Sequence, residues 1–231
     1  MGVAAVKAIV LASFAMWTMG FEGFTTWLYP DERGLVTTGE GDLCDSIAAA
    51  QELPWENQDG TLTSPSDVAA AWTIVKNCGL GKLGGGNPRI QALTTIRLTK
   101  AGVAALVQKK LLADEIIIRQ RVGSVAWDEL CADAQMGTMS LDWANGPWMK
   151  FPNFLAALQR EDFARWDADK NLLAGCCAKE CFMPPSANPG NNLTRRNAAN
   201  QTFFVTAQRV VDQGLDPEVL HYGDTDPAGP C

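Results

Sequence analysis

Two carboxylic acids and a hydroxyl lie close together near the start of the chain, as Glu22, Asp31 and Thr37. Two carboxyls can act as a general acid and an ionised partner only if their surroundings differ. Glu22 ends an apolar stretch, where partial burial and the negative end of a helix dipole disfavour the carboxylate form. Asp31 stands in a polar turn and should stay ionised, while the Thr37 hydroxyl could orient a water molecule. The three residues therefore suggest acid-base chemistry.

A helix followed by a β-hairpin is predicted to position these groups. Residues 3–21 are apolar on nearly all sides, which predicts a core helix that Gly23 ends. Short apolar segments within residues 27–38 flank a Pro-Asp-Glu-Arg-Gly turn, which favours a hairpin. The uncharged part of the first segment is shorter than the roughly 20 residues that cross a bilayer. We therefore expect a mature helix, rather than a membrane anchor or a cleaved export signal.

The rest of the chain is predicted to be mainly helical. Residues 44–64 are polar and irregular, and the glycine-rich segment 79–86 is typical of a flexible loop. Residues 184–192 are predicted to interrupt the helices, and residues 214–231 are predicted to form a loosely structured tail. Helices are predicted at residues 67–77 with Ser66 as the N-cap, 99–121 with Thr99 as the N-cap, 132–145, 151–158, 161–174 and 195–213.

A longer pattern surrounds the two acids and reads E-G-x5-Y-x-D-x2-G-x2-T-x-G-x-G, starting at Glu22. It resembles the phage-type lysozymes, glycoside hydrolase family 24, with the acids and the threonine at the same separations. The resemblance implies hydrolysis of the β-1,4 bond between N-acetylmuramic acid and N-acetylglucosamine in peptidoglycan. It implies Glu22 as general acid, Asp31 as ionised partner and Thr37 as the residue that positions water. Neither a cofactor nor a metal is expected.

Later segments extend the resemblance. The helix start at Leu98-Thr99-Lys100 looks like the family's, and Trp143-Ala144-Asn145-Gly146 falls where the family ends its central, cleft-lining helix. Asn188-Pro189-Gly190 and the Arg196-Asn197-x2-Asn200 segment resemble a prophage and secreted-effector branch, whereas Gln135-Met136-Gly137 is interpreted as a chance match. The resemblance implies substrate-binding roles for Tyr29, Trp143, Asn145 and Arg196.

Two acids depart from the family pattern. Glu40 stands where the family has a small or aliphatic residue, and Asp42 where it has His or Asn. These acids are either merely solvated or bind amino groups of a modified glycan or a peptide stem, so Glu40 is a further substrate-binding candidate. Arg196 is expected to pair with one of them or with Glu22.

Composition restricts the function further. The 231 residues are 47% hydrophobic, enough to bury a core, and carry 19 Lys and Arg against 26 Asp and Glu. This acidic balance argues against a nucleic-acid surface. It also gives no long-range attraction to an anionic cell wall, so we expect delivery to the bacterial periplasm or cell wall by a phage or a secretion system.

The seven cysteines are an odd number, so at least one thiol stays unpaired within the chain. The cluster Cys176, Cys177 and Cys181 lacks the four ligands of a structural zinc. A disulfide formed after export and buried free thiols both remain open for it.

The sequence as a whole predicts an α+β, lysozyme-like fold, with a small β-hairpin lobe, a larger helical lobe and a cleft between them. Residues 1–213 are expected to form one catalytic domain with an insertion at 44–96, followed by the tail 214–231. The protein is expected to be a monomer whose partner is the peptidoglycan glycan strand. An immunity or inhibitor protein would be a second partner, and no stable membrane insertion is expected. A lytic transglycosylase, a non-catalytic peptidoglycan-binding module and a membrane-active toxin are the rival functions.

Overall fold

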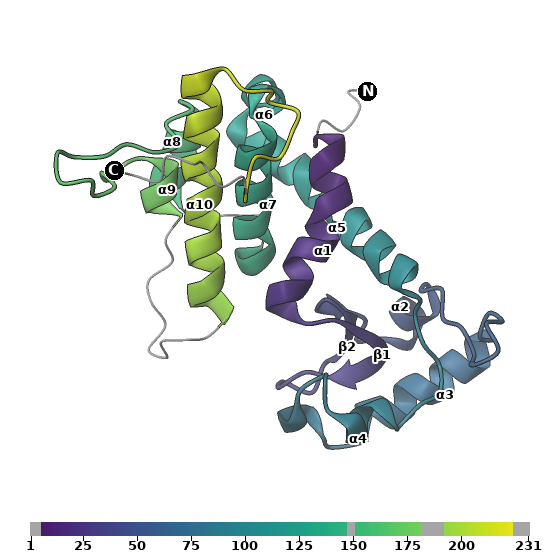
Figure 1. Ribbon diagram of the computed structural model, residues 1–231. Coiled ribbons are helices and arrows are strands. Elements are labelled where there is room, and N and C mark those ends of the chain that lie inside the picture. The colour runs from purple at the N-terminus through teal and green to yellow at the C-terminus, as the bar shows by residue number, and fades with distance from the viewer. Residues whose placement is uncertain (1–5, 147–150, 182–191, 224–231) are drawn as a thin grey trace. The chain divides into compact units, whose positions relative to one another are not determined.

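A computed structural model describes residues 6–146, 151–181 and 192–223, which form helices and one small antiparallel sheet (Figure 1). The chain divides into two compact units. We call Ala15–Lys109 the sheet unit, and Met1–Phe14 with Lys110–Cys231 the helical unit. Helices α1 (Ala8–Glu22) and α5 (Lys100–Val122) contribute residues to both. The class is therefore α+β, as predicted.

Three strands make the sheet in the order β1, β2, β3 (Figure 1). Strand β1 (Thr25–Pro30) pairs with β2 (Val36–Gly39), which pairs with β3 (Asp42–Leu43). The β1–β2 hairpin confirms the prediction. Strand β3 was not predicted, because two residues are too few to show an alternating pattern.

Short helices and one longer helix complete the sheet unit. They are α2 (Ile47–Gln51), α3 (Pro65–Lys76), the 3₁₀ turn η1 (Gly81–Leu83) and α4 (Pro88–Gln91). The core places Leu28 and Val36 of the sheet in the same cluster as Val68 and Val75 of α3. The predicted N-cap Ser66 is wrong: Ser64 Oγ accepts from the backbone N of Asp67, because Pro65 already occupies the first helical position.

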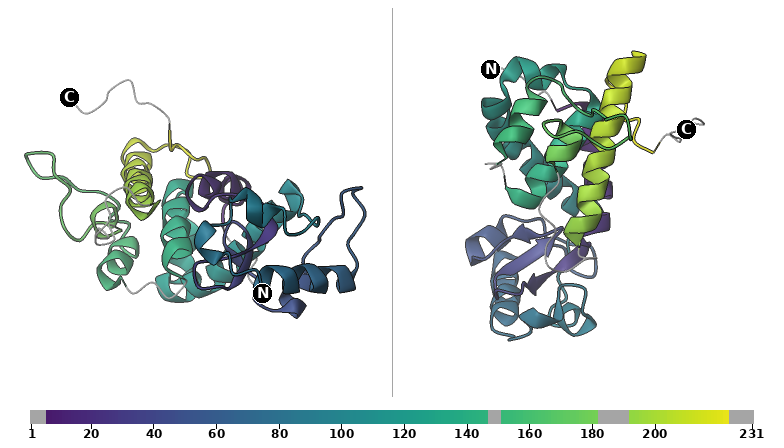
Figure 2. Two further views of the ribbon diagram at one scale, coloured as in Figure 1. Left: turned by 90° about the horizontal axis from the view of Figure 1, so that it is seen from below. Right: turned by 90° about the vertical axis from the view of Figure 1, so that its left-hand side faces the viewer.

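In the helical unit, α7 (Ala132–Asn145) is buried at every position from Ala132 to Asp142. Helix α10 (Asn192–Gln213) runs beside it in Figures 1 and 2. The predicted helices at 99–121, 132–145, 151–158 and 195–213 are confirmed, and Thr99 caps α5 by accepting from the backbone N of Gly102. The unit also contains α6 (Ser124–Glu129), α8 (Pro152–Leu158) and α9 (Cys177–Glu180).

Gly137 marks a close approach of α7 to α10. A Cβ atom on Gly137 would lie 2.9 Å from Cζ of Phe204 and 3.0 Å from Cβ of Phe203. Such distances are shorter than ordinary van der Waals contact, so only glycine fits here without displacement. The segment interpreted as a chance match therefore has a packing role.

Gly137→Ala is expected to lower the free energy of unfolding by about 1–3 kcal/mol, because the added methyl overpacks the contact with the two phenylalanines. Gly20→Ala is the matched control, since a Cβ on Gly20 in α1 would meet nothing within 4 Å. The control should raise the free energy of unfolding by about 0.5–1 kcal/mol, because alanine restricts the unfolded chain. Urea unfolding measures the free energy of unfolding of both variants. Changes of equal size and the same sign would contradict the packing assigned to Gly137.

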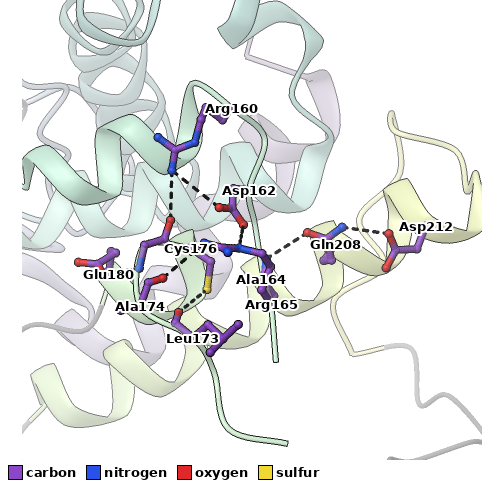
Figure 3. Close-up of polar contacts among 11 residues, drawn as sticks. Arg160, Asp162, Ala164, Arg165, Leu173, Ala174, Cys176, Glu180, Gln208 and Asp212 are labelled. Atoms are coloured by element: carbon purple, nitrogen blue, oxygen red, sulfur yellow. Dashed lines mark hydrogen bonds and ion pairs between the residues drawn. The ribbon is translucent and has the colours of Figure 1, made fainter. Parts of the chain in front are cut away.

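The helix predicted at 161–174 is wrong. The segment forms a turn in which Asp167 Oδ1 accepts from the backbone N of Asp169 and of Asn171, and Lys170 has φ 62. Asp and Asn side chains that bond neighbouring amides compete with the helix. Figure 3 shows how the base of this segment is held, with Arg165 Nε donating to Asp162 Oδ1 at 2.7 Å and the backbone N of Ala164 donating to Gln208 Oε1 of α10 at 3.1 Å.

Two further expectations are corrected at the ends of the chain. Helix α1 is not buried all round, because Phe14 is fully buried while Met16 is 75% exposed. The tail is ordered as far as Gly223, since Tyr222 stacks on Phe203 and the backbone N of His221 donates to Asp133 Oδ2 at 3.0 Å. Residues 224–231 and the predicted break at 184–192, apart from Asn192, lie outside the described residues.

The six described cysteines are free thiols, and five of them are buried, including Cys176, Cys177 and Cys181. Burial raises the pKa of the Cys181 thiol to about 12, which keeps it protonated and unreactive near neutral pH. Among the described residues, no helix has both the length and the apolar character required to span a bilayer.

Candidate functional site

Tyr29 lies at the centre of the candidate residues in the sheet unit. It is directly opposite Thr37 in the β1–β2 pair, so the two side chains share one face of the sheet. Burial raises the pKa of Tyr29 to about 12, and nearby carboxylates add to this effect. In decreasing order of effect, these carboxylates are Asp42, Glu22 and Asp31. The two predicted catalytic acids therefore lie within electrostatic range of the same phenol.

Asp31 begins the turn between β1 and β2. Its Oδ1 accepts hydrogen bonds from the backbone N of Arg33 and of Leu35, both at 2.8 Å. Its own backbone N donates to the Leu35 carbonyl at 2.8 Å. No described residue donates to Oδ2. One carboxylate oxygen therefore shapes the turn, and the other is left for water or a ligand.

Glu22 is the last residue of α1, and Gly23 ends the helix as predicted. Gly23 has φ +78, a conformation that favours glycine, and its backbone N donates to the Met19 carbonyl at 3.2 Å. Glu22 is exposed, so the partial burial expected from the sequence is wrong.

Thr37 is 5% exposed, and its Oγ1 donates to the Leu35 carbonyl at 3.2 Å. Because the hydroxyl proton is used in this bond, the remaining lone pairs can only accept. A water molecule held by Thr37 must therefore donate one of its protons to Oγ1. A lone pair of that water then points away from Thr37. This is the orientation that a nucleophilic water requires.

The second turn, between β2 and β3, carries the two unexpected acids. Gly39 has φ +62, and a Cβ there would lie 2.5 Å from Asp42 Oδ2, so a larger residue would displace that carboxylate. The backbone N of Glu40 also donates to Asp42 Oδ2, at 3.4 Å. Glu40 is only 2% exposed, which excludes the solvated alternative for this residue. Asp42 is half-buried.

The glycine-rich segment predicted to be a flexible loop packs against β1 instead. The Gly85 carbonyl accepts from Nε1 of Trp27 at 2.9 Å. A Cβ on Gly85 would lie 2.9 Å from Cδ2 of Tyr29, and one on Gly81 would lie 2.4 Å from the carbonyl oxygen of Asp31. Glycines that recur at short spacing can permit such close backbone approach, but the sequence alone does not show what they approach.

Gly81→Ala is expected to push the segment away from Asp31, because the new methyl would collide with a backbone atom. We expect the free energy of unfolding to fall by about 1–3 kcal/mol, together with any activity that depends on Asp31. Gly86→Ala is the matched control, since nothing lies within 4 Å of its added Cβ, and its effect should stay within about 0.5 kcal/mol. If urea unfolding gave equal stabilities for both variants, the close packing would be disproved.

Three candidates belong to the helical unit. Trp143 is half-buried and packs on the ring of Phe14, with 5.5 Å between centroids. Asn145 is the last residue of α7, and its Nδ2 donates to the Leu141 carbonyl at 2.7 Å. Arg196 is 2% exposed on α10. The candidate residues are thus divided between the two units.

The set in the sheet unit comprises Glu22, Tyr29, Asp31, Thr37 and Glu40. That the two sets line one cleft, and that Arg196 pairs with one of the acids, remain predictions. The expected single domain at 1–213, with its insertion at 44–96, remains one as well. Asn188-Pro189-Gly190 lies outside the described residues.

No protein-family model, curated protein or solved structure matches the chain. The resemblance to the phage-type lysozymes therefore depends on the residues quoted above.

Proposed function

We propose that the protein is a peptidoglycan hydrolase, a muramidase that cleaves the β-1,4 bond between N-acetylmuramic acid and N-acetylglucosamine. One observation carries the proposal: Glu22 and Asp31 both act on the Tyr29 phenol, within a helix, turn and sheet that contain the whole lysozyme-like pattern. A Glu near a helix end or a turn Asp alone is commonplace. Two such acids around one phenol, at the family's spacing, favour catalysis.

The proposed reaction assigns each group one task. Glu22 donates a proton to the glycosidic oxygen as the bond to the leaving sugar breaks. Asp31, through Oδ2, accepts a proton from the attacking water or stabilises the positive charge that develops on the sugar. Thr37 holds that water by accepting a hydrogen bond from it. No cofactor takes part.

Substrate contacts are assigned to the remaining candidates. Tyr29 presents a phenol that burial keeps neutral, so it can donate a hydrogen bond to a sugar oxygen or a carbonyl. Trp143 offers an aromatic face to a sugar ring, and Asn145, Arg196 and Glu40 complete the proposed set. The protein would act in the bacterial periplasm or cell wall after delivery by a phage or a secretion system.

Purified sacculi test the proposal in two assays run side by side. Wild-type protein should reduce the turbidity of the suspension, whereas Glu22→Gln and Asp31→Asn should leave it high yet still sediment with the sacculi. A lytic transglycosylase that uses one acid would lose activity with Glu22→Gln but keep it with Asp31→Asn. A wild-type protein that sediments with sacculi but never clears them, at any pH, would overturn the proposal in favour of a binding module.

A further inference from the structure

A buried cluster of charged groups joins α5 to the end of α7 within the helical unit. The Asp142 carboxyl on α7 lies within hydrogen-bonding reach of the Asp114 carboxyl on α5, and the two residues are 1% and 8% exposed. Lys110 Nζ, one turn before Asp114, donates to Asp114 Oδ2 at 2.8 Å. The same Nζ lies 3.9 Å from the centre of the Trp143 ring. The cluster therefore also contacts Trp143, the residue that follows Asp142.

Two carboxyls can hydrogen-bond to each other only if one of them carries a proton, because two carboxylates offer no donor. Lys110 donates to Asp114, whose carboxyl therefore serves as an acceptor, so we place the proton on Asp142. Burial, followed by the charge of Asp114, raises the pKa of Asp142 to about 7, and Lys110 and Arg121 act in the opposite direction. In the described structure, Asp142 Oδ1 has no hydrogen-bond partner that could stabilise a negative charge.

Charged groups also lie on the elements around this cluster. From α5, the groups that act on Asp142 are Lys110, Asp114 and Arg121. On α10, Arg209 acts on Asp133 in the first turn of α7, and Arg196 is buried on the same helix. Near that first turn, the backbone N of Lys7 donates to Gln135. The proton of Asp142 is thus governed mainly from α5.

We propose that Lys110, Asp114 and Asp142 form a proton-dependent clamp that positions the Trp143 indole. With the proton present, the cluster is neutral: one ammonium, one carboxylate and one carboxylic acid. When the proton leaves to solvent, two buried carboxylates share one ammonium, and the bond between them is lost. Charge repulsion then separates the end of α7 from α5 and draws Lys110 from the indole.

The clamp also gives the proposed muramidase a means of controlling glycan binding, a consequence that rests on the proposed function. Lys110 covers one face of the Trp143 ring through a cation–π contact. The part of the ring that Lys110 and Phe14 leave uncovered would be the one that contacts a sugar. Lys110, Asp114 and Asp142 are thus positioning residues, since none of them is assigned a contact with substrate.

Indole NMR of the full-length protein labelled with nitrogen-15 tests the clamp without any substrate. Trp143→Phe identifies the Trp143 indole signal among those of the eight tryptophans. In the wild type this signal should shift with a single midpoint near pH 7. In Asp142→Asn, whose amide can still donate to Asp114, it should keep its low-pH position throughout. Asp128→Asn, an exposed carboxylate on α6, is the control and should retain the wild-type midpoint.

A second variant keeps the test valid if the Asp142→Asn protein does not fold. Asp114→Asn removes the negative charge beside Asp142, so the midpoint should move to lower pH. A wild-type indole that does not shift between pH 5 and pH 9, or an Asp142→Asn protein that keeps the transition, would overturn the clamp. A midpoint that Asp114→Asn leaves unchanged would also overturn it.

Kinetics with soluble glycan strands test the link to substrate. If the wild type hydrolyses them, KM should rise several-fold above the midpoint, and Asp142→Asn should show no such rise. An indole that titrates while KM stays constant would refute the positioning role. If the wild type does not hydrolyse glycan at all, the proposed function fails, and the NMR titration still decides whether the clamp exists.

Discussion

Glu22→Gln should reduce peptidoglycan hydrolysis by about 10²–10⁴-fold, the contribution typical of a positioned general acid. Glutamine keeps the size of the side chain at the exposed end of α1, but its amide is too weakly acidic to protonate the leaving oxygen. Folding should be unaffected, because the side chain is exposed. Release of soluble muropeptides from sacculi, followed over time, measures the rate.

Glu32→Gln is the matched control for this prediction. Glu32 is an exposed acid in the β1–β2 turn, next to Asp31, and has no proposed role. Its substitution changes the net charge by the same amount and should leave the rate near that of the wild type. Equal losses in the two variants would indicate a general charge effect, and an active Glu22→Gln protein would remove Glu22 from the mechanism.

Asp142→Asn should remove most of a pH dependence in the stability of the protein. Burial raises the pKa of Asp142 from 3.8 to about 7, so the folded state binds a proton that the unfolded state has released over this range. The stabilisation is complete below about pH 4 and is lost as the pH rises to about 7. The loss amounts to at most about 4 kcal/mol, from about three pH units at 1.36 kcal/mol each.

Urea unfolding between pH 4 and pH 8 isolates this contribution as the difference between wild type and variant. The wild type should lose stability relative to Asp142→Asn as the pH rises, and the difference should be constant above about pH 7. A smaller slope of the same sign should remain in the variant, because burial also raises the pKa of Asp133. A difference that does not change with pH would contradict the shared proton.

The sequence predicted the longer elements well because their signals are local. Thr99 and Gly146 mark helix ends in any context, and the helix at Ala132–Asn145 matches its predicted range. The β1–β2 hairpin follows from its turn residues. For the elements containing Glu22 and Asp31, local chemistry was sufficient.

Features that depend on tertiary contacts were missed. The glycines at 81 and 85 were interpreted as flexibility, and only packing against Tyr29 and Asp31 gives them a role. The false helix at 161–174 arose because its composition suits a helix, while bonds from Asp167 to nearby amides favour a turn. Asp114 and Asp142 lie on different helices, and neither residue is distinctive within the sequence of its own helix.

The central claim is that water cleaves the glycosidic bond with Glu22 as the acid, and digestion of sacculi in oxygen-18 water tests it most directly. Mass spectrometry of the products should show one heavy oxygen at each new reducing end with wild-type protein, and no new ends with Glu22→Gln. Products that have lost water, as anhydro sugars, or labelled reducing ends released at the wild-type rate by Glu22→Gln, would contradict the account.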